Sequence, residues 1–419
     1  MQSVAHNQQA EIHWLSVAQL ALSALAIFIL WAAAAAVALL ALGGLSLASP
    51  AAQDLLSSML MAATAGVGGL LLLPSAIYAF LRVIGRPASR PGRSPAIVRP
   101  TVLIFLLPVV ILLGNWVSGN PSIAWLFLPP LHVLAIGLPV WWLLYLGVRG
   151  LPFGSLQRRW GVFGSGLVLG PALILVAELA AILAFAVIGV IWLSGQPQLA
   201  AQFTALLQQL QSSNASTDQI IQALIPYLAS PVVIVAVFVF GSVIVPLIEE
   251  FFKPIGVWLL VGRDLTPAAG LAAGLMSGAG YALFESLALT SSGGDWALLV
   301  VARIGTAVVH ITTAGLTGWA LTQAWRQGRY VRLAVTYLTA VLIHGLWNGL
   351  TLTSVFAGLG AAQASFPQIP LISRLGSIAP IGLVLLTLVV FAIMLHSNRV
   401  MRRTAQPEPA SELPGSMAS

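Results

Sequence analysis

The chain contains no cysteine, and only one of its 18 basic residues, Lys253, is a lysine. Without cysteine, disulfides, thiolate metal sites and a thiol nucleophile are excluded. Charged residues make up only 7% of the 419 residues, whereas 59% are hydrophobic and the mean hydropathy is +0.97. This composition excludes a soluble domain and predicts an all-α, polytopic transmembrane helical bundle.

The formal net charge of +7 does not indicate a nucleic-acid partner. The arginines fall in short segments between apolar runs instead of forming one basic patch. We therefore expect the lipid bilayer as the surroundings of the chain, and no nucleic acid.

About ten apolar runs are long enough to cross a bilayer, which takes about 20 residues per crossing. Arginines gather after the second, fourth, sixth, eighth and tenth runs, whereas the linkers on the other side carry only Arg374. By the positive-inside rule, this pattern predicts that both termini are cytoplasmic. The runs lie near residues 15–43, 55–84, 101–117, 123–147, 162–194, 231–262, 267–290, 297–325, 333–358 and 376–396.

The sixth run carries three ionisable residues, Glu249, Glu250 and Lys253. Charges in hydrocarbon cost at least a few kcal/mol each, so such a cluster is a hypothesis for a functional site. A charge pair that neutralises itself inside the bundle would explain Lys253 and one glutamate, but not the second. Pro246 and Pro254 flank the cluster and free backbone carbonyls, which predicts a kinked or opened helix.

The next run contains a stripe of small residues, Gly270, Gly274 and Gly278, spaced four apart. Such a stripe lets another helix approach closely. Glu285 lies deep in the same run. It is either a buried structural carboxyl or, as we favour, a third carboxyl of a shared site.

Two further runs carry histidines. Arg303 and His310 are seven residues apart and share a helix face, and we expect Arg303 to reach the outer surface or to pair with Glu285. His344 and Asn348 lie one turn apart on a later run. Either histidine could be a hydrogen-bonded packing residue, but together with the glutamates they indicate a site.

Carboxylates, imidazoles and an amide in one dry cavity can activate water. One glutamate would take the proton, and histidine and asparagine donors would face the developing negative oxygen. The same side chains can instead bind zinc, because two histidines and one glutamate form a catalytic ligand set with an open position. The spacing does not decide between these, and the chain lacks the His-Glu-x-x-His, Gly-x-Ser-Gly and Gly-x-Gly-Asp patterns of other proteases.

Four motifs in this order resemble the PrsW family of intramembrane proteases, which is related to the CAAX prenyl endopeptidases and the Abi proteins. The resemblance covers roughly residues 231–358. One departure is that Ser286 stands where the family usually has asparagine. The motifs are Glu249-Glu250-x-x-Lys253, Gly280-Tyr281-Ala-x-x-Glu285, His310 and His344-x-x-Trp347-Asn348.

The resemblance implies an intramembrane endopeptidase that cleaves a membrane-protein substrate, an anti-sigma factor in the founding case. It implies a multi-pass protein of the bacterial cytoplasmic membrane. By this analogy the catalytic residues are Glu249, Glu250, His310, His344 and Asn348, and the supporting residues are Lys253, Glu285 and Arg303.

No cofactor is favoured, because two adjacent glutamates do not easily coordinate one ion from a helix; the favoured mechanism is glutamate-activated water. The alternative is zinc, held by Glu250, His310 and His344.

Two other functions remain open at this stage. Buried glutamate, lysine, arginine and histidine are also what proton relays use, so a proton- or ion-coupled transporter is the first alternative. Its weakness is that no internal repeat carries matching polar residues. A non-catalytic relative that binds a membrane partner is the second alternative, and the complete set of site residues argues against it.

We expect five parts in the chain. They are N-terminal membrane helices with about five spans (1–194), an extracytoplasmic amphipathic linker (195–230), a catalytic four-helix core (231–358), a final span (359–403) and a disordered cytoplasmic tail (404–419).

Overall fold

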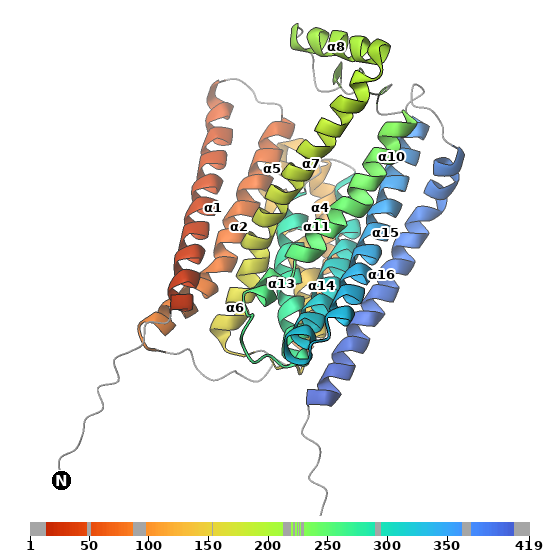
Figure 1. Ribbon diagram of the computed structural model, residues 1–419. Coiled ribbons are helices and arrows are strands. Elements are labelled where there is room, and N and C mark those ends of the chain that lie inside the picture. Colours follow the sequence, from red (N-terminus) through yellow and green to blue (C-terminus); the bar gives the residue numbers. More distant parts are fainter. Residues whose placement is uncertain are drawn as a thin grey trace, which may run out of the picture.

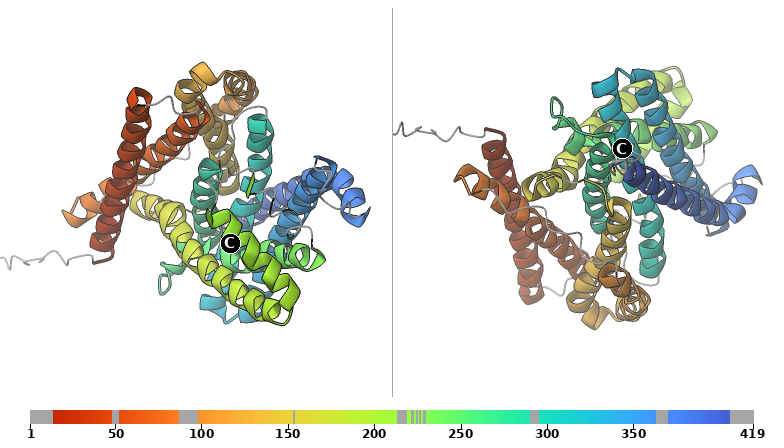
Figure 2. Two further views of the ribbon diagram at one scale, coloured as in Figure 1. Left: turned by 90° about the horizontal axis from the view of Figure 1, so that it is seen from above. Right: turned by 90° about the horizontal axis from the view of Figure 1, so that it is seen from below.

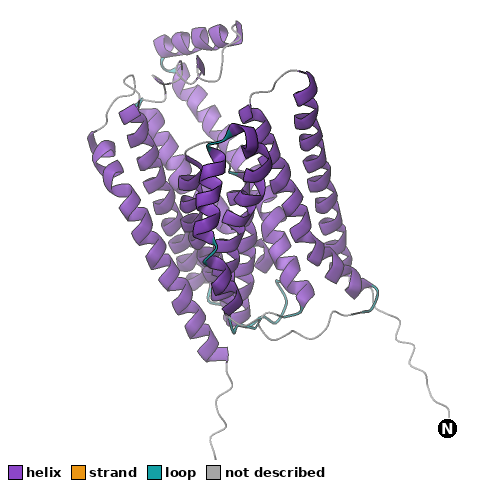
Figure 3. Ribbon diagram, turned by 180° about the vertical axis from the view of Figure 1, so that it is seen from behind, coloured by secondary structure: helices purple, strands orange, loops and turns teal. Residues whose placement is uncertain are grey.

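The computed structural model describes residues 14–47, 52–86, 98–152, 154–212, 230–289, 295–362 and 370–405, together with residues 219, 220, 223, 225 and 227. Every regular element in these residues is a helix, as the colouring of Figure 3 shows. The predicted all-α class is therefore confirmed. The expected tail lies, from residue 406 on, outside the described residues.

Ten helical segments in the described part of the chain are long and apolar enough to cross a membrane, which confirms the expected number. Each coincides with one of the ten predicted runs. The segments are Trp14–Gly43, Asp54–Val83, Pro100–Ser118, Pro121–Val148, Leu156–Ser194, Pro231–Trp258, Pro267–Ala288, Trp296–Gln327, Tyr330–Ala361 and Pro370–Thr404.

Two helices form the centre of the bundle, α13 (Pro267–Ala288) and α14 (Trp296–Gln327). In their most apolar stretches 83% and 67% of the residues are buried, against 6% in α1 (Trp14–Leu47). Viewed along the bundle, α1 and its partner α2 (Ala52–Val83) lie together at one side (Figure 2). The buried pair at the centre is the natural place for polar side chains that must be kept from lipid.

Five further helices belong to the same bundle. They are α3 (Val98–Ile104), α4 (Leu107–Ser118), α5 (Pro121–Val148), α15 (Tyr330–Ala362) and α16 (Pro370–Ala405).

The described chain begins and ends at the same end of the bundle, at the lower end of Figure 1, as an even number of crossings requires. The cytoplasmic location of the two termini stays a prediction.

The expected amphipathic linker contains a helix, α8 (Pro197–Ser212), which lies across the opposite end of the bundle (Figure 1). Phe203, Leu206 and Leu210 are half-buried, whereas Leu207 is exposed. The Phe203 ring packs edge-on against Tyr227, with the ring centres 5.6 Å apart. The apolar side of the helix is thus partly covered by the chain that follows it.

The sixth span is not one continuous helix. It consists of α10 (Pro231–Val239), a π-helical turn η2 (Phe240–Ile244), α11 (Val245–Phe252) and the short α12 (Ile255–Trp258). The break between α11 and α12 falls at Lys253 and Pro254, as the proline predicts. π-helical turns are rare and occur often at functional sites.

A second π-helical turn, η1 (Ser165–Leu169), separates α6 (Leu156–Gly164) from α7 (Gly170–Ser194) in the fifth span. It packs directly on α13 without side chains between the two backbones. A Cβ atom on Gly166 would lie 2.0 Å from the Ser277 carbonyl oxygen, and one on Gly280 would lie 2.4 Å from that of Phe163. The two glycines therefore allow the fifth span to pack in backbone contact with α13.

The glycine stripe of α13 packs against α14, as the sequence predicts. A Cβ atom on Gly274 would lie 2.3 Å from the Ala314 carbonyl oxygen, and one on Gly278 would lie 2.7 Å from that of His310. Such distances are far below van der Waals contact, so only glycine permits this approach. Close packing here fixes the backbone from which His310 projects.

We expect Gly274→Ala to lower the free energy of unfolding by about 1–3 kcal/mol, because the added methyl group forces the two central helices apart. Thermal unfolding of the detergent-solubilised protein measures the change. Gly189→Ala on α7 is the control, since a Cβ atom there has nothing within 4 Å. Equal stability of the two variants would contradict this account of the stripe.

Candidate active site

The carboxylates of Glu249 and Glu250 on α11 meet the ammonium group of Lys253, which directly follows this helix. Lys253 Nζ lies 2.9 Å from Glu249 Oε2 and 2.8 Å from Glu250 Oε1. Lys253 and Glu250 have no solvent-exposed surface, and Glu249 is 7% exposed. Because the lysine follows the glutamates by four and three residues, one turn of helix brings both carboxylates to it.

Two histidines from the neighbouring helices reach the same ammonium group. Lys253 Nζ lies 2.7 Å from Nδ1 of His310 on α14 and 3.2 Å from Nδ1 of His344 on α15. The imidazole rings meet edge to face, with their centres 5.0 Å apart. Both rings are buried. Together with the two carboxylates, the structure thus brings together four of the five side chains predicted as catalytic.

Glu285 lies on the far side of His310 and orients its ring. His310 Nε2 is 2.6 Å from Glu285 Oε2, which also pairs with Arg303 at 2.9 Å. The expected pairing of Arg303 with Glu285 is confirmed. Since the carboxylate accepts at Nε2 and the ammonium donates at Nδ1, the partners place the imidazole proton on Nε2 and a lone pair on Nδ1.

The departure from the family pattern at Ser286 is accommodated by the same arginine. Arg303 Nε donates to Ser286 Oγ over 3.1 Å while its terminal nitrogen pairs with Glu285. The serine thus anchors the guanidinium that holds the carboxylate.

The helix break beside the cluster is stabilised by a side chain that the sequence did not single out. Ser277 Oγ donates to the carbonyl oxygen of Lys253 over 2.6 Å and accepts from the N–H of Gly256 over 3.2 Å. Both backbone groups lose their helical partners at the break. Ser277 satisfies them and so supports the backbone that carries Lys253. Residue spacing within one span does not predict this role of Ser277, because the contact joins two different spans.

Asn348 binds the backbone of the sixth span. Its Nδ2 donates to the carbonyl oxygen of Gly241 over 2.8 Å, inside the π-helical turn η2. This bond uses one of the two protons of the amide group. The catalytic role of Asn348 stays a prediction.

On the same helix, Gly345 lets α15 approach η2 closely. A Cβ atom on Gly345 would lie 2.2 Å from the Ser242 carbonyl oxygen, so the glycine brings His344 to the cluster.

Tyr281 also borders the cluster, and it was not among the predicted site residues. Its ring packs edge-on against His310, with the ring centres 5.2 Å apart. Lys253 Nζ lies 5.0 Å from the centre of the tyrosine ring. The place of Tyr281 in the motif Gly280-Tyr281-Ala-x-x-Glu285 is the feature of the sequence that could have indicated this contact.

The cluster contains a candidate metal-ligand set. One side-chain donor atom from each of Glu249, His310 and His344 lies within 4.8 Å of the others, and all three residues are buried. From the sequence, Glu250 instead of Glu249 was predicted as the carboxylate ligand. Glu250 Oε1 lies 3.0 Å from His344 Nδ1. Two imidazoles and a carboxylate suit zinc, and the Glu285 contact on the far nitrogen of His310 is the partner that ligating histidines usually have.

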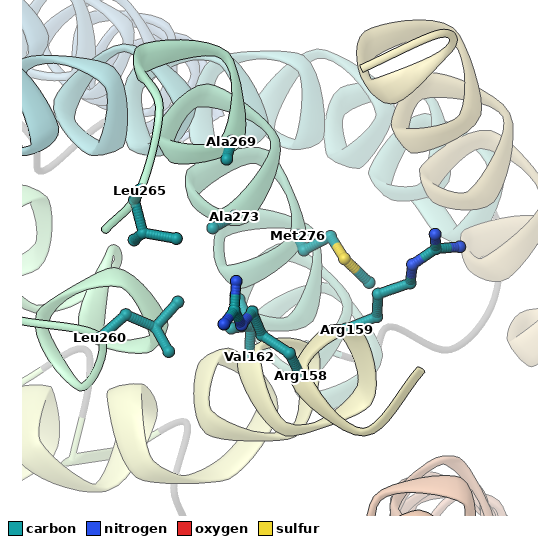
Figure 4. A pocket seen from close by; sticks show the side chains of 8 residues that line it. All are labelled: Arg158, Arg159, Val162, Leu260, Leu265, Ala269, Ala273 and Met276. Atoms are coloured by element: carbon teal, nitrogen blue, oxygen red, sulfur yellow. The ribbon is translucent and has the colours of Figure 1, made fainter. Parts of the chain in front are cut away.

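A small pocket lies elsewhere, between α6 and the beginning of α13 (Figure 4). It is lined by two arginines and otherwise by apolar side chains, without carboxylate or imidazole groups. None of the predicted site residues lines it, so it is not the place of the chemistry described above. Its lining residues are Arg158, Arg159, Val162, Leu260, Leu265, Ala269, Ala273 and Met276.

A buried cluster of carboxylates and imidazoles inside a helical membrane bundle is typical of a functional site, either of an enzyme that acts within the membrane or of a proton-coupled transporter. The sequence profile of the PrsW family, described as an intramembrane metalloprotease family, matches residues 160–375, just over half of the chain. The chain therefore belongs to the PrsW family and is a peptide hydrolase. The match includes the expected core, 231–358, and begins before it. No curated protein and no solved structure matches the chain.

We expect Ser277→Ala to lower the free energy of unfolding by about 1–3 kcal/mol, because two buried backbone groups lose their partner. Chemical or thermal unfolding in detergent measures this. Ser377→Ala is the control, since Ser377 is exposed and bonds only within its own helix. If the two variants unfold alike, Ser277 does not support the break.

Proposed function

We propose that the chain hydrolyses a peptide bond of a membrane protein at the cluster formed by Glu249, Glu250, His310 and His344. The observation that carries this proposal is the convergence of these four side chains, from three helices, on a single buried point. Burying so many ionisable groups in a membrane bundle is costly, so the cluster indicates a functional site. Family membership assigns that chemistry to peptide hydrolysis.

Glu250 is the proposed general base. Its Oε1 accepts from Lys253 and lies 3.0 Å from His344 Nδ1, whereas its Oε2 is buried and has no hydrogen-bond partner among the described residues. A carboxylate oxygen that is free in this way can accept a proton from an attacking water. The same carboxyl group then donates the proton to the nitrogen of the scissile amide as the bond breaks.

Glu249, His310 and His344 are the proposed zinc ligands. Although adjacent glutamates on a helix do not easily reach one ion, both carboxylates lie within 2.9 Å of a single ammonium nitrogen. The donor set and the family's description as metalloproteases both support zinc. When bound, zinc supplies a Lewis acid that polarises the carbonyl and makes a bound water easier to deprotonate.

Glu285 and Arg303 are the proposed positioning residues. Glu285 holds the far nitrogen of His310, and Arg303 holds Glu285. Neither needs to touch the substrate, because their contacts fix the direction in which His310 Nδ1 points.

The proposed substrate is a membrane protein of the bacterial cytoplasmic membrane, by analogy with the family. Its cleavage would be a step of regulated proteolysis.

We expect Glu249→Gln and Glu250→Gln each to lower the cleavage rate by at least about 100-fold, because one loses a ligand carboxylate and the other the base. Cleavage of a reconstituted membrane-protein substrate is followed on gels, with thermal unfolding as the check of folding. Asp54→Asn is the control for the loss of a carboxylate, since Asp54 is exposed in the first turn of α2, away from the cluster. Full activity of both cluster variants would refute the assignment.

Zinc dependence is tested separately. We expect purified protein to contain one zinc per chain, a chelator to abolish cleavage, and added zinc to restore it. His344→Ala should lower the zinc content, whereas His396→Ala, at an exposed position of α16, should leave it unchanged. Cleavage that persists after complete removal of metal would instead establish glutamate-activated water without a metal.

A further inference from the structure

We infer that Lys253 competes with the metal ion for the same position, so that its ammonium group and zinc exclude each other. The inference rests on the zinc site proposed above. Its basis is that the ammonium nitrogen is the common neighbour of the whole donor set. Nζ lies between 2.7 and 3.2 Å from one donor atom each of Glu249, Glu250, His310 and His344.

The competition is clearest at His310. Its Nε2 faces the Glu285 carboxylate, which can only accept, and its Nδ1 faces an ammonium group, which can only donate. The lone pair of Nδ1 is therefore engaged by Lys253. A metal ion binds an imidazole through that lone pair, so Nδ1 cannot serve both partners at once.

The carboxylates give the same result. Glu249 Oε2 pairs with Lys253 at 2.9 Å, and Glu249 belongs to the group that can hold the ion. A metal ion bound to these atoms would lie within a few ångströms of the ammonium nitrogen, without solvent between them. Two cations at that distance in a buried site repel strongly. One of them has to leave.

Lys253 is the partner that can move. Its charge sits on a flexible four-carbon stem, whereas the histidines and glutamates are held by packed helices. The residue lies directly after the last residue of α11 and before Pro254, where the helix is broken. The ring of Tyr281, centred 5.0 Å from Nζ, offers the displaced ammonium a cation–π partner. Lys253 therefore determines how tightly the site binds metal.

The first test measures zinc affinity. Competition titrations with a chromophoric chelator should show that Lys253→Met binds zinc at least about tenfold more tightly than the unaltered protein, because no ammonium has to be displaced. Arg326→Met is the control for the loss of one positive charge, since Arg326 is exposed and pairs with Asp264 at 3.5 Å. Equal or weaker zinc binding by Lys253→Met overturns the inference.

The second test needs no substitution and so does not depend on whether the variant folds. Lys253 is the only lysine in the chain, so protein grown with lysine labelled with carbon-13 at Cε gives a single lysine resonance. One equivalent of zinc should shift this resonance, and the same amount should leave it unshifted in His344→Ala. Bound zinc with an unchanged resonance overturns the inference. No zinc binding by the unaltered protein overturns it too, while the cleavage assay then shows whether hydrolysis stands without metal.

Discussion

The site depends on the ion pairs of one buried ammonium group with two carboxylates of the preceding helical turn. Removing one partner from such a buried pair typically costs about 3–5 kcal/mol, because an uncompensated charge remains inside the protein. With four acceptor atoms around one ammonium nitrogen, Lys253 also contacts the histidines of two other helices. The geometry of the cluster is thus maintained by a cation even when no metal is bound.

Keeping this charge in a membrane requires helices that pack closely and a backbone whose polar groups are all satisfied. Glycines bring the π-helical turns and the central helices within backbone contact, and they do so at positions next to His310 and His344. Ser277 and Asn348 supply the hydrogen bonds that the broken sixth span needs at Lys253 and Gly241. The proposed catalytic groups and the structural polar groups therefore occur side by side, and only their contacts distinguish them.

Much of this architecture could be predicted from the sequence. Hydropathy is a strong signal in a membrane protein, because a span must be about 20 residues long and apolar, and all ten predicted spans are present. The residues of the cluster were also predictable, since ionisable groups are rare in such spans. The glycine stripe was read correctly from its spacing of four.

Other features depend on contacts between distant spans and carry no local signal. The role of Ser277 arises from a neighbour 24 residues away in another helix. The engagement of Asn348 with Gly241 could not be foreseen, because the π-helical turn that exposes this carbonyl has no distinctive sequence. The choice between Glu249 and Glu250 as a ligand depends on side-chain directions that one turn of helix leaves open.

The π-helical turn η2 has a consequence for how the sixth span meets two different surroundings. A π-helical turn contains one residue more than an α-helical turn, and one residue corresponds to a rotation of about 100° around the helix axis. Val232 and Val235 of α10 are more than half exposed at the outside of the bundle, while Glu250 of α11 is fully buried. The inserted residue acts as a phase shift between these two halves, so the lipid-facing side and the glutamate-bearing side of a single span are set independently.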